Sequence, residues 1–209
     1  MSQTVHFFVY DGFADWEAAF ALAGIHQPDF QRQPGRYQVR TVALAQSPMR
    51  SLGGVAVLPD ALLDTLEPQD SAMLILPGGL GWEQGQHQLA VDKARACLMA
   101  GVPVAAICGA TAGLARAGLL DDRRHTSNAL AYLKGVPEYA GSDRYEDQPA
   151  FTDGGLITAG GMAPLEFARE IFRTLQIYDE EVLDAWYTLY KRGDPAAFAR
   201  MQAAGAVTA

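Results

Sequence analysis

The sequence predicts an α/β fold, a sandwich of three layers with a mostly parallel central sheet. Short apolar runs rich in β-branched residues recur along the chain, and segments with helical periodicity separate several of them. Runs that are apolar throughout are typical of parallel strands covered on both faces, and alternation of strand and helix places the sheet between helical layers. We expect strands at 4–10, 37–44, 55–58, 72–76, 102–107 and 155–159, and helices at 13–25, 86–100, 109–117 and 162–176.

The 209 residues suit one domain with a terminal extension, since a domain usually takes about 100–200 residues. We expect the domain to span 1–176 and a helical extension to span 177–209. Asp179, Glu180 and Glu181 are typical of a helix start, because carboxylates are favoured in the first turn. Gly193 is a stop signal, and Asp194-Pro195 begins another helix. The extension is too short and too apolar to stand alone, so it should pack on the domain or on a dimer partner.

Two further segments shape the expected domain. Gly53-Gly54 breaks the chain before the strand expected at 55–58. The stretch 137–154 is polar and punctuated by Gly and Pro, which is typical of a loop with a short hairpin.

The charge and the apolar content exclude several classes of partner. The net charge of −8 argues against nucleic acid or an anionic membrane surface as the main partner. No run reaches the ~18 apolar residues of a membrane span. The start of the chain resembles a strand and not a signal peptide, so we expect a cytoplasmic location. Two cysteines cannot form a disulfide framework, and four histidines show no metal-ligand spacing, so neither a metal nor a cofactor is expected.

Cys108 is the residue most indicative of chemistry. The buried run 102–107 leads directly into a helix of small residues, with Cys108 at the junction. Such a tight turn, a nucleophile elbow, presents a side chain at the carboxyl end of a strand, where open α/β sheets bind ligands. The positive end of the following helix should lower the thiol pKa. Cys97 lies in the middle of a helix instead, where a cysteine is most simply a packing residue.

The turn after the strand at 72–76 is the expected partner of this elbow. It reads Pro77-Gly78-Gly79, and glycines let backbone N–H groups approach a ligand oxygen closely. Paired with the N–H of Gly109, the N–H of Gly79 would form an oxyanion hole. A Pro-Gly-Gly turn by itself is a weak signal.

Glu17 and His125 are the candidate acid–base residues. Glu17 falls within the apolar stripe of the first helix, where a carboxylate is costly unless it is protonated or hydrogen-bonded. A protonated Glu17 facing Cys108 would donate to the thiolate, although a position at the rim of the helix remains the alternative. Asp15, nearby, is explained by the helix dipole. His125 is the one histidine after Cys108, so it is the default general base, with a purely structural histidine as the alternative.

These segments together resemble the ThiJ/PfpI family of the class I glutamine amidotransferase-like superfamily. The resemblance covers about residues 4–176 and rests on Tyr10-Asp11-Gly12 with Glu17, Leu76-Pro77-Gly78-Gly79, Ala106 to Thr111, Gly118 to Asn128, and Ile157 to Ala168. It implies a flavodoxin-like sandwich, a nucleophilic or redox-sensitive Cys108, a carboxylic partner at Glu17 and often a dimer. The extension is similar to that of a bacterial subgroup labelled glutamine amidotransferase-like or protease-related.

Departures from the family pattern argue against two of the reactions known in the family. Family members called proteases place a His directly after the nucleophilic Cys, whereas Gly109 stands here. Glutaminase domains use a His and a Glu near the domain end, and no His follows 125, so the usual triad cannot form. Isonitrile-hydrating relatives use an Asp in the first helix, an option that Asp15 leaves open.

Three hypotheses follow. The first is a cysteine-dependent enzyme, hydrolase-like or lyase-like, on a small carbonyl- or amide-type substrate, in which Cys108 attacks, Glu17 and His125 assist, and Gly79 and Gly109 form the oxyanion hole. The second is a redox or stress sensor in which Cys108 is oxidised with little catalysis. The third is a binding module in which Cys108 only shapes a pocket.

Overall fold

A computed structural model describes residues 3–206 of the chain, and within them a seven-stranded sheet forms the centre. Its strand order is β5-β2-β1-β6-β7-β9-β8, and every pairing is parallel except that of β8 with β9. The strands span β1 Gln3–Phe8, β2 Tyr37–Ala43, β5 Ala61–Leu62, β6 Met73–Leu76, β7 Val104–Ile107, β8 Ala150–Asp153 and β9 Leu156–Ala159. The predicted mostly parallel sheet is confirmed.

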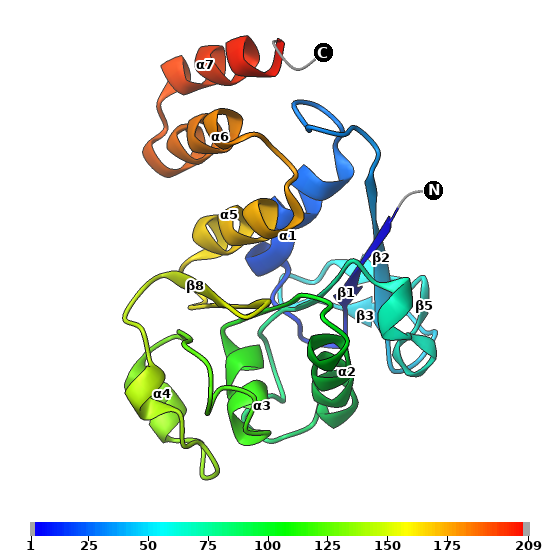
Figure 1. Ribbon diagram of the computed structural model, residues 1–209. Coiled ribbons are helices and arrows are strands. Elements are labelled where there is room, and N and C mark those ends of the chain that lie inside the picture. Colours follow the sequence, from blue (N-terminus) through cyan, green and yellow to red (C-terminus); the bar gives the residue numbers. More distant parts are fainter. Residues whose placement is uncertain (1–2, 207–209) are drawn as a thin grey trace.

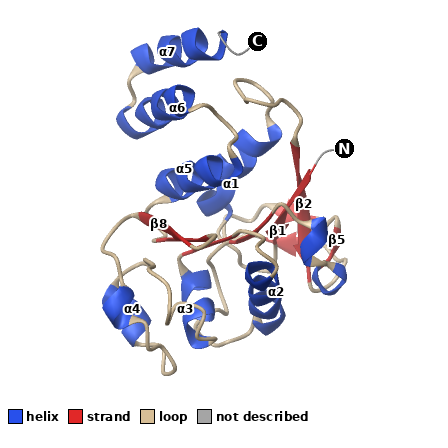
Figure 2. Cartoon of the chain, in the orientation of Figure 1, coloured by secondary structure: helices blue, strands red, loops and turns tan. Residues whose placement is uncertain are grey.

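Helices cover both faces of the sheet (Figures 1 and 2). α1 (Asp15–His26) and α5 (Pro164–Leu175) lie on one face, and α2 (Gln88–Met99) and α3 (Gly109–Arg116) lie on the other. The short helix α4 (Leu130–Lys134) lies beside α3. The three layers are those of a flavodoxin-like sandwich, as expected.

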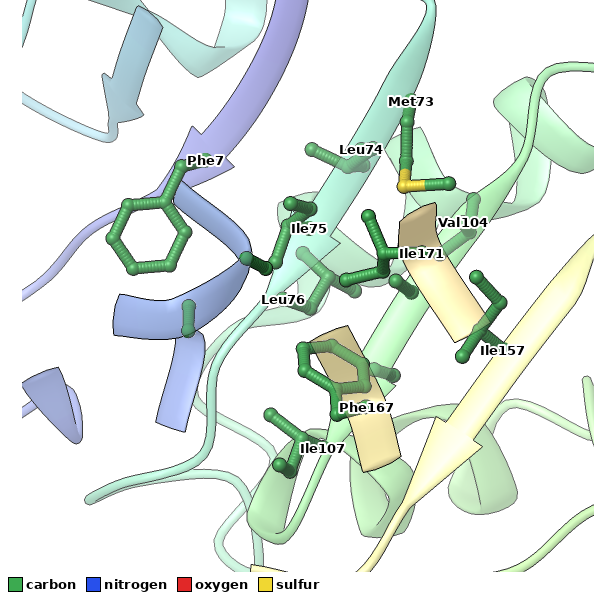
Figure 3. Close-up of a cluster of buried hydrophobic side chains, with 14 of the residues drawn as sticks. Phe7, Met73, Leu74, Ile75, Leu76, Val104, Ile107, Ile157, Phe167 and Ile171 are labelled. Atoms are coloured by element: carbon green, nitrogen blue, oxygen red, sulfur yellow. The ribbon is translucent and has the colours of Figure 1, made fainter. Parts of the chain in front are cut away.

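One part of the core lies between the central strands and α5 (Figure 3). All the side chains of β6, β7 and β9 are buried, which is why these strands are apolar throughout. Phe167 and Ile171 of α5 are fully buried, and Figure 3 shows them over Ile107 and Ile157. This core fixes the carboxyl ends of β6, β7 and β9 relative to one another.

A strand lies within the expected range 55–58, but it is not part of the central sheet, so its place among the parallel strands was predicted wrongly. Ala56–Val57 forms β4, which pairs antiparallel with β3 (Met49–Arg50) in a separate ribbon. Gly54 has a φ of 82° and its N–H donates to Ser51, so the chain folds back on itself before it can reach the sheet. The sheet position beside β2 belongs instead to β5.

The stretch 137–154 contains one strand, β8, and not the complete hairpin expected there, because the partner strand β9 begins just beyond it. β8 and β9 pair across a Gly154-Gly155 turn, in which both glycines have positive φ. The described part of the chain also has three 3₁₀ turns, at Leu63–Thr65, Pro68–Asp70 and Ser142–Arg144.

The extension forms two helices, α6 (Glu180–Arg192) and α7 (Pro195–Ala206), joined at Gly193 with a φ of 62°. The Trp186 ring lies 5.0 Å from that of Phe172 and 6.3 Å from that of Phe20, measured between centroids. α6 therefore packs on α5 and α1 of its own chain, and α7 lies over α6 (Figure 1). Within residues 3–206, none of the helices combines the length and the apolar character that a membrane crossing needs.

Candidate active site

Cys108 occupies a strained elbow between β7 and α3. Its backbone has a φ of 56° and a ψ of −123°, a conformation that residues other than glycine rarely adopt. Such strain costs about 1–3 kcal/mol and is found mainly at functional sites. The sequence prediction of a turn that presents Cys108 at the carboxyl end of a strand agrees with this geometry.

Hydrogen bonds hold the elbow in this conformation. The N–H of Cys108 donates to the carbonyl of Ala159 at 2.9 Å, which ties the elbow to the end of β9. The hydroxyl of Thr111 donates to the carbonyl of Cys108 at 2.6 Å and lies 2.6 Å from the hydroxyl of Ser127. Since Thr111 is fully buried, these bonds are shielded from water and stabilise the strained backbone.

Glu17 lies beside Cys108 and is buried, with 1% of its surface exposed. Its Oε2 accepts a hydrogen bond from the N–H of Gly78 at 2.6 Å, and its side chain is hydrogen-bonded to the Cys108 thiol. The predicted contact between Glu17 and Cys108 is present. On the apolar stripe expected for the first helix, Phe13 and Gly24 are buried, whereas Trp16 is 51% exposed and lines a pocket.

Glycines let two backbone segments approach the sulfur. A Cβ on Gly78 would lie 2.6 Å from the Cβ of Cys108 and 2.9 Å from the backbone nitrogen of Gly109. A Cβ on Gly161 would lie 2.9 Å from the Cys108 sulfur and 3.2 Å from Oε1 of Glu17. Side chains at either position would therefore displace the reactive groups, and Oε1 of Glu17 is the carboxyl oxygen near the sulfur.

Asn128 completes the surroundings of the sulfur, and the sequence reasoning did not assign it a role. Its Nδ2 lies 3.5 Å from the Cys108 sulfur, and its Oδ1 accepts a hydrogen bond from the N–H of Gly161 at 2.8 Å. Its position three residues after His125, in the segment that resembles the family, could have indicated it. Its contact with Cys108 could not be predicted, because the two residues are 20 positions apart in the sequence.

The ionisation of Cys108 and that of Glu17 depend on each other. Burial raises the pKa of Glu17, whereas the Gly78 N–H and the Cys108 thiol lower it. Burial also raises the pKa of Cys108 to about 11, and the negative charge of Glu17 adds to the rise, while Asn128 and the Gly109 N–H oppose it. The sequence predicted a lowered thiol pKa because it counted the helix terminus without the burial and the carboxylate. That direction was wrong for the state in which Glu17 is charged.

Protonation of Glu17 changes its effect on Cys108 from opposing the thiolate to stabilising it. It removes the carboxylate charge that repels a thiolate, and it adds an O–H donor beside the Asn128 and Gly109 donors. The two groups therefore titrate as a pair. When the pair holds one proton, the negative charge lies either on the Cys108 sulfur or on Glu17. The sulfur is more accessible and has several hydrogen-bond donors around it, whereas buried Glu17 has the Gly78 N–H, so the charge is better stabilised on the sulfur.

An aromatic cluster supports the Gly78 turn from behind. The Tyr10 hydroxyl donates to the carbonyl of Gly78 at 2.8 Å, and Nε1 of Trp82 lies 2.8 Å from that hydroxyl. The His87 ring lies tilted against the Tyr10 ring, with 4.1 Å between their centroids. This cluster fixes the turn that carries the hydrogen-bond donor for Glu17.

His125 does not meet Cys108 in the structure. It is fully buried, its Nδ1 lies 2.8 Å from the carbonyl of Arg123, and its Nε2 lies 2.7 Å from the hydroxyl of Tyr139. Both ring nitrogens thus have partners within its own region of the chain. The geometry gives His125 a structural position, and the base role expected from chain order is not supported.

The remaining predicted residues lie around the elbow. The N–H of Gly109 is hydrogen-bonded to the Cys108 sulfur. Gly79 pairs with Phe13 across an isolated bridge, and its carbonyl would lie 3.3 Å from a Cβ on Gly109. Asp15 accepts a hydrogen bond from the N–H of Gly53 at 3.2 Å, so it binds the β3–β4 turn.

A pocket of about 370 Å³ opens over Cys108. Its wall is formed by Trp16, Glu17, Cys108, Asn128, Gly160, Gly161 and Met162. This volume is within the range of small-molecule sites. Among residues 3–206, no group of three His, Cys, Asp or Glu residues is arranged to bind a metal ion.

Comparison with known proteins gives consistent results. The sequence model of the DJ-1/PfpI family matches residues 3–174. The chain is 39% identical over 201 residues to a Bacillus subtilis protein named uncharacterized protease YoaZ, covering 94% of this chain and 95% of the relative. It is 28% identical over 187 residues to uncharacterized protease YdeA of the same organism, covering 90% of each.

Solved structures share the fold of this chain. A ThiJ/PfpI family protein from Bacillus anthracis superposes with a TM-score of 0.90 at 37% identity, covering 98% of this chain and 97% of the other. The DJ-1 superfamily protein Atu0886 from Agrobacterium tumefaciens gives a TM-score of 0.81 at 34% identity, covering 91% and 98%.

Proposed function

This chain belongs to the DJ-1/PfpI family, and from that premise we propose that it is a cysteine-dependent enzyme acting on a small carbonyl- or amide-type substrate. The observation that carries the proposal is the strained Cys108 elbow, with Glu17 against the sulfur and a 370 Å³ pocket above it. The size of this pocket favours a small molecule over a folded protein as substrate.

The first step is attack by the Cys108 thiolate on the carbonyl carbon of the substrate. The carbon–sulfur bond forms as the C=O π pair moves to the oxygen. The N–H groups of Gly79 and Gly109 would donate to that oxyanion, whose stabilisation is a large part of catalysis in such reactions. Glu17 holds the proton of the pair during this step, so that the sulfur enters as a thiolate.

The second step uses the proton on Glu17. With an aldehyde or ketone, Glu17 donates the proton to the alkoxide and gives a hemithioacetal or hemithioketal. With a 2-oxoaldehyde such as methylglyoxal, the resulting Glu17 carboxylate moves a proton from the hemithioacetal carbon to the neighbouring carbonyl carbon, and water hydrolyses the thioester that forms, which releases a 2-hydroxy acid and the Cys108 thiolate. With an amide, the proton goes to the leaving nitrogen as the C–N bond breaks, and water then hydrolyses the thioester. In the amide route, Glu17 takes a proton from the attacking water, which restores the pair.

Turnover of small substrates tests the proposal. Methylglyoxal and simple amides are suitable first substrates, assayed by disappearance of the carbonyl or release of the amine. We expect the Cys108→Ala variant to lose all turnover and the Cys97→Ala variant to keep it, because Cys97 is fully buried on α2. Equal turnover in wild type and Cys108→Ala would overturn the mechanism.

A redox or stress-sensing role is the second candidate, and the contrast between the cysteines favours it. Cys108 is partly exposed and has a hydrogen-bond donor from Asn128 beside its sulfur, whereas Cys97 is fully buried on α2. Mild peroxide followed by mass measurement and peptide mapping should place added oxygen on Cys108. Oxidation of both cysteines at equal rates would contradict this role.

The proposal includes a cytoplasmic homodimer. Exposed apolar side chains support the dimer: Leu52 and Val55 lie on the β3–β4 ribbon, and Trp16 and Leu80 lie near the pocket and the Gly78 turn. Light scattering coupled to gel filtration should give twice the 22.5 kDa of one chain. A mass of one chain at micromolar concentration would contradict the dimer.

A further inference from the structure

A second pocket, of about 430 Å³, adjoins the pocket over Cys108. Asn128, Gly160 and Met162 line both pockets, so they form the boundary between them. Asn128 also lies 3.5 Å from the Cys108 sulfur. A ligand that reacts at Cys108 can therefore extend past Asn128 into the second pocket.

The two pockets differ in the chemistry of their walls. Around Cys108 the wall is formed largely by Trp16, Met162 and glycine backbone. The second pocket is lined by polar side chains from four separate parts of the chain, among them Ser127, Asp147, Gln148, Glu166 and Lys191. A ligand that fills both pockets therefore needs a compact reactive end and a polar tail.

The charged side chains of the second pocket determine which charge on a ligand tail is favoured there. Lys191 forms an ion pair with Glu166 at 2.7 Å, and the Tyr187 hydroxyl donates to the same carboxylate at 2.6 Å. Within residues 3–206, Asp147 makes no ion pair or side-chain hydrogen bond. One uncompensated carboxylate is left facing the pocket, which favours a cationic tail over an anionic one.

We infer that the second pocket is a subsite for the tail of the substrate, and that the tail is an amine or another cationic group. The inference rests on the proposed function, because it assigns the substrate class of the same site. It also gives the extension a role in binding, since α6 supplies Lys191 and Tyr187 holds Glu166 in place. Asp147 is then a specificity-determining residue.

Alkylation of Cys108 by tailed reagents tests the subsite without a known substrate. Three iodoacetamides with 2-aminoethyl, 2-hydroxyethyl and 2-carboxyethyl groups on the amide nitrogen differ mainly in tail charge. Their rates at Cys108, followed by mass spectrometry, are divided by their rates with N-acetylcysteine. We expect the amino reagent to react about fivefold faster than the hydroxy reagent, the effect of one charge contact in water, and the carboxy reagent to be slowest.

Two variants separate Asp147 from the overall charge of the protein. Asp147→Asn should remove the fivefold preference, whereas Glu181→Gln, which removes the same charge from an exposed position on α6, should keep it. Lys191→Gln should increase the preference, because it leaves Glu166 without its cation.

The outcomes distinguish the two proposals. Equal normalised rates for the three reagents, or a preference that survives Asp147→Asn, would overturn the subsite. No alkylation of Cys108 by any of the reagents would instead overturn the proposed function.

Discussion

At the residue scale, the environment separates two cysteines that composition cannot distinguish. Cys97 is fully buried on α2, whereas Cys108 is partly exposed on a strained backbone with Glu17 beside it. Glu17 matters in two ways, because its charge opposes the thiolate and its proton supports it. A variant at Glu17 therefore tests both the reactivity of the thiol and the proton transfer, whereas a variant at Cys108 tests only the need for the sulfur.

Glu17→Gln should separate the reactivity of the thiol from turnover. Glutamine keeps a neutral hydrogen-bond donor beside the sulfur but cannot transfer a proton, so we expect turnover to fall by about 10²–10⁴-fold. Alkylation of Cys108 by iodoacetamide at neutral pH should continue. Parallel loss of both activities would mean that Glu17 only shapes the site.

The buried carboxyl also predicts a pH dependence of stability. Because burial raises the pKa of Glu17 above its ordinary value of 4.5, the folded state binds the proton more tightly than the unfolded state. The contribution is fully present below pH 4.5 and is lost as the pH rises through the raised pKa. Urea unfolding of wild type and Glu17→Gln at a series of pH values should show this loss in wild type alone. The same slope in both proteins would contradict it.

At the element scale, the sequence missed the short helix α4, but it predicted α1, α2, α3 and α5 to within a few residues, and the elbow between β7 and α3. These elements are determined by local patterns, a buried strand followed by small residues or an apolar helical stripe. The segment 55–58 forms a strand, but in a two-stranded ribbon outside the central sheet, and Val55 there is 53% exposed. An apolar run shows that a strand is possible but does not identify its partner.

The packing of α6 gives a prediction about the extension. Trp186 is 6% exposed and contacts Phe20 and Phe172, so truncation to alanine would leave a large cavity between α6 and the domain. We expect Trp186→Ala to lower the free energy of unfolding by about 3–5 kcal/mol, measured by urea denaturation. Tyr190→Ala on the same helix is the control, because Tyr190 is half exposed and should cost much less. Equal small losses would show that the extension folds independently of the domain.

At the scale of the whole molecule, the site is assembled from segments far apart in the sequence. Glu17, Gly78, Cys108, Asn128 and Gly161 come from five separate segments that meet at the carboxyl edge of the sheet. Residues at the ends of strands or on a helix face could be predicted, since the topology places them at this edge. Asn128 could not, because it lies in a loop whose path depends on tertiary packing. His125 was chosen for its order in the chain, and the loop turns it toward Tyr139 instead.

The central claim is that Cys108 and Glu17 share one proton near neutral pH and that Glu17 holds it. The most direct test is the rate of Cys108 alkylation by iodoacetamide against pH, with the site assigned by peptide mapping. The account predicts a midpoint below the ~8.5 of a free thiol, because the proton on Glu17 leaves the sulfur charged. A midpoint near 11, the value expected for a buried thiol beside a charged Glu17, would place the proton on the sulfur and contradict the account.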